Sequence, residues 1–184
     1  MRILSGDPGK VNFALSILDV EGPKLNFIGT RMFRNPVPTL AGDIAQSIKD
    51  FEKELKQLDR DYGPFDAVCF ERFQSRGLKG NTIECISLML GLIARHYTSK
   101  KIPVMLITAA QWKNAFNKEL DLKGLYASHK MTTKQFKKEI HEFDAALIGI
   151  YSFCVMNEIV PFSGFASHSE TLVQKFESSP ILLS

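Results

Sequence analysis

The chain opens with short apolar runs separated by turn residues. Residues 2–6, 11–19 and 24–33 each have the length and apolar content of a β-strand, and Asp7-Pro8-Gly9-Lys10 and Gly22-Pro23 interrupt them. Pro8 followed by Gly9 suits the two central positions of a type II turn. Three consecutive strands joined by such short breaks predict an antiparallel meander at the start of the fold.

After residue 40 the pattern alternates between helical and strand periods. Apolar residues recur at helical spacing from Leu40 to Leu58, and Gly63-Pro64 ends that helix. Strands that alternate with helices predict βαβ units, so the expected fold class is α/β, with a mixed five-stranded sheet and helices on both faces. The later segments are expected, in order, to be a strand at 65–71, a helix at 81–97, a strand at 102–107, a short helix at 108–116, and helices near 132–140 and from 142 onward.

The last helix begins with two polar side chains. In HEFDAALIGIYSFCVM, residues 141–156, His141 and Asp144 are three residues apart and share one helix face. A helix that is apolar on most sides is a buried helix, so these two groups must be paired or bound to a metal. The apolar positions form two stripes, one of Phe143, Leu147, Ile150 and Cys154 and one of Ile148, Tyr151 and Val155.

Length and composition favour one domain. The chain has 184 residues, of which 45% are hydrophobic, and a domain of this size buries about 70% of its unfolded-chain surface. We expect the domain to span residues 1–159 and residues 160–184 to form an extension of unknown role. Cys69, Cys85 and Cys154 stand singly in apolar runs, which indicates reduced packing residues. Without a secretory or membrane-spanning pattern, the expected location is the cytoplasm, and a phage gene in a bacterial host is a compatible source.

Positive charge is concentrated in one part of the chain. The net charge is +3, but the segment from Arg95 to Glu139 contains ten Lys or Arg residues and three Asp or Glu residues. A solvated surface and a surface that binds a polyanion both fit this pattern.

Acidic residues fall where the expected fold brings chain segments together. Asp7 ends the first strand, and Glu71 ends a strand that we expect beside it. A helix packed on that face could bring His141 and Asp144 to the same place. Three carboxylates beside an imidazole would repel each other or lose their hydration at high cost unless a divalent cation lies between them. Magnesium suits such a site, because it takes a few carboxylates and accepts phosphate oxygens.

Four motifs in this order resemble the RuvC-type Holliday junction resolvases of the ribonuclease H superfamily. They are GDPGKVNFALSILD, FDAVCFERF, PVMLITAAQWKNAF and HEFDAALIG, and together they lie within residues 2–153. The resemblance implies a ribonuclease H-like fold. It also implies that Asp7, Glu71, His141 and Asp144 are the catalytic and metal-binding residues, with family members varying between Asp and His at the position of His141.

The implied activity is resolution of four-way (Holliday) and other branched DNA junctions by a metal-dependent endodeoxyribonuclease. Two Mg²⁺ ions would support phosphodiester hydrolysis, with Asp7 bridging them. His141 would be either a nitrogen ligand, which raises the tolerance for Mn²⁺, or a group that positions the attacking water and relays its protons. The expected DNA contacts are Arg72, Phe73, Arg76, Lys113 and Lys134, of which Phe73 would stack on a base and the cations would bind phosphates.

Such enzymes act as homodimers, because two strands must be cut. The resemblance places the interface on the helix at 81–97, where Ile83, Ile86, Leu90 and Ile93 form an apolar ridge. Burial of this helix within one subunit is the alternative.

The site residues also have purely structural explanations. Asp7 suits a turn before Pro-Gly, and Glu71 could pair with a neighbouring arginine. His141 could lie on the surface before the helix, where Asp144 would stabilise the first turn. Phe73 could be a packing residue, and Lys113 suits the solvated side of an amphipathic helix.

Three other functions stay open at this point. A nuclease of the same fold that cuts flaps or RNA would use the same residues. The actin-like ATP-binding fold also has an Asp-x-Gly turn between its first strands, but it needs a second phosphate loop in a repeated half. A catalytically silent DNA-binding subunit is the third, although every site position carries a competent side chain.

Overall fold

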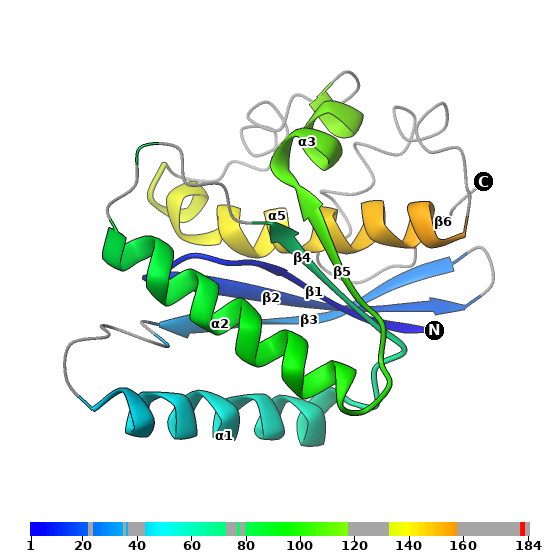
Figure 1. Cartoon of the computed structure of the whole chain (residues 1–184). Helices are drawn as coiled ribbons and strands as arrows, with labels where there is room; N and C mark the ends of the chain where they lie inside the picture. The colour runs from blue at the N-terminus through cyan, green and yellow to red at the C-terminus, as the bar shows by residue number, and fades with distance from the viewer. Residues whose placement is uncertain are drawn as a thin grey trace.

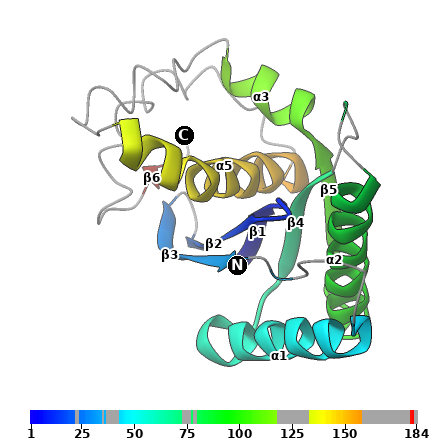
Figure 2. The same ribbon diagram turned by 90° about the vertical axis from the view of Figure 1, so that its left-hand side faces the viewer.

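A computed structural model describes residues 1–21, 24–34, 36, 43–72, 77, 80–117, 133–157 and 181–182. One sheet, with strand order β5-β4-β1-β2-β3-β6, separates two helical layers. Helices α1 and α2 cover one face, and α5 crosses the other (Figures 1 and 2). The strands are β1 (Arg2–Asp7), β2 (Asn12–Glu21), β3 (Lys24–Arg34), β4 (Ala67–Arg72), β5 (Val104–Thr108) and β6 (Ile181–Leu182), and the helices are α1 (Ile44–Tyr62), α2 (Gly80–Thr98), α3 (Ala109–Asn117) and α5 (Thr133–Met156).

The strand pairing confirms the predicted fold class. Strand β2 is antiparallel to both β1 and β3, which makes the meander. Strand β4 is parallel to β1 and to β5, as βαβ units require. Among the described residues, no helix is long and apolar enough to cross a membrane.

Three local expectations were wrong. The two helices expected at 132–140 and from 142 onward form one continuous helix, α5. The sheet has a sixth strand, β6, which pairs with the first two residues of β3. Because β6 has only two residues, its sequence shows no alternation of apolar and polar positions that would predict a strand. The turn after β1 is not type II, because Gly9 does not adopt the positive φ that this type requires. Gly9 is needed for space instead: a Cβ there would lie 2.4 Å from the backbone oxygen of Asn12.

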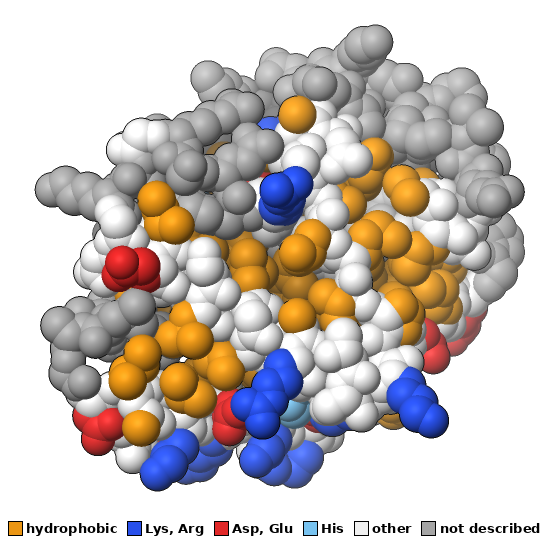
Figure 3. Space-filling model, in the orientation of Figure 1, with side chains coloured by type: hydrophobic (Ala, Val, Ile, Leu, Met, Phe, Trp, Pro, Cys, Tyr) orange, Lys and Arg blue, Asp and Glu red, His pale blue; other side chains and the backbone are white. Residues whose placement is uncertain are grey.

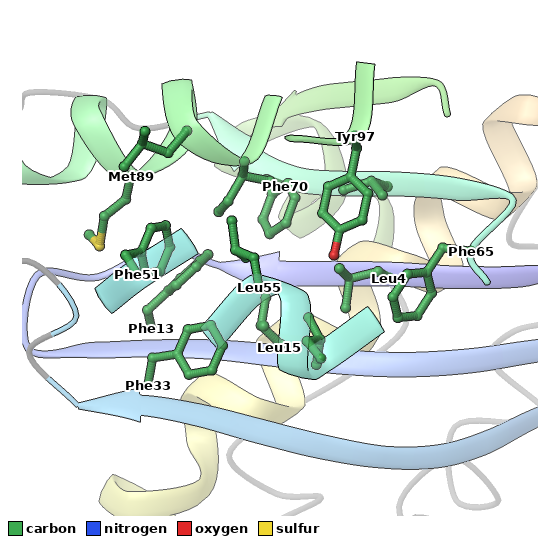
Figure 4. Close-up of a cluster of buried hydrophobic side chains, with 14 of the residues drawn as sticks. Leu4, Phe13, Leu15, Phe33, Phe51, Leu55, Phe65, Phe70, Met89 and Tyr97 are labelled. Carbon is green, nitrogen blue, oxygen red and sulfur yellow. The ribbon is translucent and has the colours of Figure 1, made fainter. Parts of the chain in front are cut away.

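Two hydrophobic cores hold the layers together. Aromatic and aliphatic side chains fill the space between the sheet and the α1–α2 layer, among them Phe13, Phe51 and Phe70, whose rings lie 5.8–6.3 Å from centroid to centroid (Figure 4). The second core joins α5 to the other face of the sheet and includes Trp112. The three cysteines are buried and free, as predicted.

Helix α5 is apolar on most, but not all, of its surface. The stripe of Phe143, Leu147, Ile150 and Cys154 is buried, and so is Ile148. Tyr151 is half-buried, and Val155 is 46% exposed, so the second predicted stripe turns away from the sheet along its length. The helix therefore covers one face of the sheet and keeps a solvent side.

Small residues let α5 approach β1 closely. A Cβ on Gly149 would lie 2.5 Å from Oγ of Ser5 and 2.5 Å from Cδ1 of Leu18. The hydroxyl of Ser5 donates a hydrogen bond of 2.7 Å to the backbone oxygen of Ala145, one turn earlier in α5. This contact fixes how the part of α5 around Ala145 and Gly149 lies over the sheet.

We predict that Gly149→Ala destabilises the protein by about 1–3 kcal/mol, because the new methyl group overpacks a rigid contact. The matched control is Gly91→Ala in α2, where a Cβ would meet nothing within 4 Å. That change should be neutral or stabilising by up to ~1 kcal/mol, since alanine favours a helix over glycine. Urea unfolding followed by circular dichroism measures both. Equal effects of the two changes would contradict the proposed contact.

Candidate active site

The predicted acidic residues meet at one end of the sheet. Strands β1 and β4 are parallel neighbours, so their carboxyl ends share an edge, and Asp7 and Glu71 lie at those ends. Two residues before Asp7 and Glu71 stand Ser5 in β1 and Cys69 in β4, and both of these side chains face α5. Because side chains alternate along a strand, both carboxylates face the α5 layer.

His141 binds Asp7 directly. Nδ1 of His141 lies 2.7 Å from Oδ2 of Asp7. This hydrogen bond raises the pKa of His141 against the opposing effect of burial, and the charges of Asp7 and Asp144 add to the rise. The Arg34 guanidinium lowers it. The next residue of α5, Glu142, accepts a hydrogen bond of 3.1 Å from Thr30 of β3, which holds this part of the helix to the sheet.

Trp112 holds Glu71. Its indole Nε1 donates a hydrogen bond of 2.8 Å to Oε2 of Glu71, and the indole is fully buried. Burial raises the pKa of Glu71, the Trp112 hydrogen bond opposes this, and the nearby charge of Asp7 raises it further. The indole therefore orients the carboxylate and stabilises its charged form.

Asp144 is the least compensated of the three carboxylates. Burial, followed by the charge of Asp7, raises its pKa to about 7, and Glu71 adds to the rise. Lys113 opposes the shift, with Nζ 4.0 Å from Oδ2 of Asp144. The same ammonium lies 4.8 Å from the centroid of the Trp112 ring, so a cation–π contact keeps it beside the carboxylates.

The donor set fits a hard divalent cation in its chemistry. Two carboxylates with raised pKa values and a third beside them are what a bound Mg²⁺ or Mn²⁺ would stabilise, and carboxylate oxygens are ligands that both ions accept. Within the described part of the chain, no three His, Cys, Asp or Glu side chains yet surround a single point. The imidazole of His141 is engaged by Asp7, and the carboxylate of Glu71 by Trp112.

The other predicted contacts divide into those the structure describes and those it does not. Lys113 lies at the site, as expected, and is 42% exposed rather than turned fully to solvent. Arg72 is exposed at the end of β4. Phe73, Arg76 and the side chain of Lys134 lie outside the described residues, although Lys134 itself is in the first turn of α5.

Sequence reasoning missed two contributors to the site. Trp112 packs into the second core, and its indole N–H also binds Glu71. The second contributor is Arg34, which ends β3 beside Asn12, the residue that begins β2. Its signal in the sequence is a cation at the end of a strand close to the one that ends in Asp7.

We predict that, in EDTA, the free energy of unfolding falls as pH rises from about 4 to 7. The folded protein holds a proton on Asp144 throughout this range and the unfolded chain does not, so rising pH favours the unfolded state. His141 acts in the same direction above pH 6.5. Asp144→Asn should weaken this dependence on pH and raise the free energy of unfolding by on the order of 2 kcal/mol at pH 8. Thermal unfolding at several pH values measures this, and Mg²⁺ should flatten the wild-type curve. A pH-independent wild type in EDTA would refute the electrostatic account.

Comparisons with known proteins identify the fold. No family model and no curated protein matches the sequence. Among solved structures, RuvC from Thermus thermophilus in complex with Holliday junction substrate is 17% identical, with a TM-score of 0.63, over 86% of this chain and 98% of the other. The yeast mitochondrial Holliday junction resolvase Ydc2 is 15% identical, with a TM-score of 0.56, over 95% of this chain and 83% of the other. At these identities the likeness establishes a shared fold, and it confirms the expected ribonuclease H-like class.

Proposed function

We propose that this protein is a metal-dependent endodeoxyribonuclease that cuts four-way and other branched DNA junctions. The observation that carries the proposal is the meeting of Asp7, Glu71, His141 and Asp144 at one sheet end. Nδ1 of His141 lies 2.7 Å from Asp7, and Asp7 and Glu71 lie at the ends of neighbouring parallel strands. The fold is shared with RuvC in complex with Holliday junction substrate and with the Holliday junction resolvase Ydc2, which supports the choice of substrate. The four residues are therefore proposed to act together as the catalytic set.

The residues have separate roles in this proposal. Asp7, Glu71 and Asp144 would hold Mg²⁺, or Mn²⁺ in its place; bound as a pair, such ions activate a water and stabilise the leaving oxygen in phosphodiester hydrolysis. His141 holds or passes a proton at Nδ1, next to Asp7. Lys113 offsets the negative charge of the phosphate beside Asp144. Trp112 keeps Glu71 in place.

We predict that Asp7→Asn, Glu71→Gln and Asp144→Asn each abolish cleavage and retain junction binding. Each change removes a charge that holds the metal, while affinity depends on phosphate contacts elsewhere. The assay uses a labelled four-way junction in Mg²⁺ beside linear, flap and RNA·DNA substrates. His141→Asp should be milder, because it supplies a carboxylate in the same place.

Each other outcome has a distinct meaning. Full-rate cleavage by one of the three variants would remove that residue from the site. Faster cutting of flaps or RNA·DNA than of junctions would replace the substrate but keep the chemistry. Binding of ATP with no cutting of any DNA would favour the actin-like class instead, and junction binding with no cutting by the wild type would favour a silent subunit.

We further propose that the protein works as a homodimer through α2. The ridge expected from the sequence is only in part available for this, because Ile86 and Ile93 are buried in the subunit's own core. Ile83 and Leu90 are partly exposed on the same helix. Hydrophobic side chains reach the surface on the face that carries α2 and β5, where Leu106 is 49% exposed (Figure 3). Two copies of this face would bury apolar surface on both subunits.

We predict that Leu90→Glu separates the dimer, because it places two like charges across a two-fold axis in an apolar setting. A resolvase would then nick one strand of a junction without the paired second cut. Light scattering and a cruciform plasmid that distinguishes nicked from linear product measure this. Ala45→Glu, which adds the same group to the exposed first turn of α1, is the control and should change neither result. A wild type that is monomeric both free and on junction DNA would contradict the dimer.

A further inference from the structure

Arg34 lies at the same end of the sheet as the carboxylates, on the side away from Lys113. It ends β3 and pairs in register with Asn12, the first residue of β2. The preceding residue, Phe33, packs into the core under α1, so Arg34 faces the opposite layer, where α5 and the carboxylates lie. Met32 is the β3 residue level with Asp7, so Arg34 lies two strand spacings of about 4.8 Å across the sheet from Asp7 and two residues further along.

The charge of Arg34 is oriented but not neutralised by its partner. Its Nη1 donates a hydrogen bond to Oδ1 of Asn12, a neutral amide. Two other described arginines are paired with acids, Arg2 with Asp19 and Arg31 with Glu54. Within the described ranges, Arg34 makes no ion pair with a carboxylate, and its charge is felt by His141. An exposed guanidinium held by an amide is ready to bind an anion.

We propose that Arg34 binds a phosphate of the DNA on the β3 side of the active site. The strand that is cut then crosses the end of the sheet from α3 to β3, with Lys113 on one side of the carboxylates and Arg34 on the other. This inference rests on the proposed function and adds to it a direction for the strand and a positioning residue. Two cationic anchors on either side of the cut hold the scissile phosphate over the carboxylates.

The first test compares Arg34→Gln with Arg60→Gln. Arg60 is a matched control, because it is an exposed arginine held by a neutral amide oxygen, that of Gln57, on α1. Junction affinity is measured in Ca²⁺ over a range of salt concentrations. Arg34→Gln should weaken binding by about 10- to 100-fold, as expected for a charge-assisted hydrogen bond, and lower the log–log salt slope by about one. Arg34→Lys should be intermediate, and Arg60→Gln should match the wild type.

The second test locates the contact on the DNA. Single phosphates on each side of the cleaved bond are replaced, one at a time, by neutral methylphosphonates. One replacement, on one side of the cut, should weaken binding by the wild type about tenfold and have no effect on Arg34→Gln, because both changes remove the same contact. The same replacement should still weaken binding by Arg60→Gln.

The outcomes separate this inference from the proposed function. A wild type that cuts junctions, with Arg34→Gln indistinguishable from Arg60→Gln, would overturn the role of Arg34 alone. Equal sensitivity of wild type and Arg34→Gln to every methylphosphonate would do the same. A wild type that neither binds nor cuts DNA would overturn the proposed function, and this inference with it.

Discussion

The close contact between α5 and β1 determines the geometry of the whole site. Four residues of an α-helix rise about 6 Å, and two residues of a strand advance about 6.6 Å, so a helix stripe of period four keeps step with one face of a strand. His141, Ala145 and Gly149 form that stripe, and Asp7 and Ser5 lie along the strand. The small side chains at the second and third positions bring the imidazole at the first to within 2.7 Å of Asp7.

The same packing leaves unequal electrostatic compensation among the carboxylates. Asp7 has an imidazole partner and Glu71 an indole N–H. Asp144 has an ammonium at 4.0 Å, and burial raises its pKa to about 7. The residue delivered by α5 is thus the one whose charge depends most on a further cation. In this arrangement, binding a metal and docking α5 on the sheet are linked through one side chain.

The elements of the fold could largely be predicted from the sequence, because three strands and two long helices have clear periods. The four site residues could be grouped because Asp7 and Glu71 stand at the ends of neighbouring strands and His141 and Asp144 stand where the apolar part of α5 begins. What could not be predicted depended on contacts between distant residues. Trp112 reaches Glu71 across 41 positions, and Thr30 reaches Glu142 across 112. The period of α2 likewise showed an apolar ridge but not that Ile86 and Ile93 face the subunit's own core.

Trp112 is the one tryptophan in the chain. Its indole touches Glu71 through Nε1 and Lys113 through the ring face, so the dominant long-wavelength fluorophore of the protein is part of the candidate active site. Its emission depends on the charge and hydration of those two neighbours. The metal and DNA binding that we propose can therefore be followed optically in the unlabelled protein, without a dye that would disturb the site.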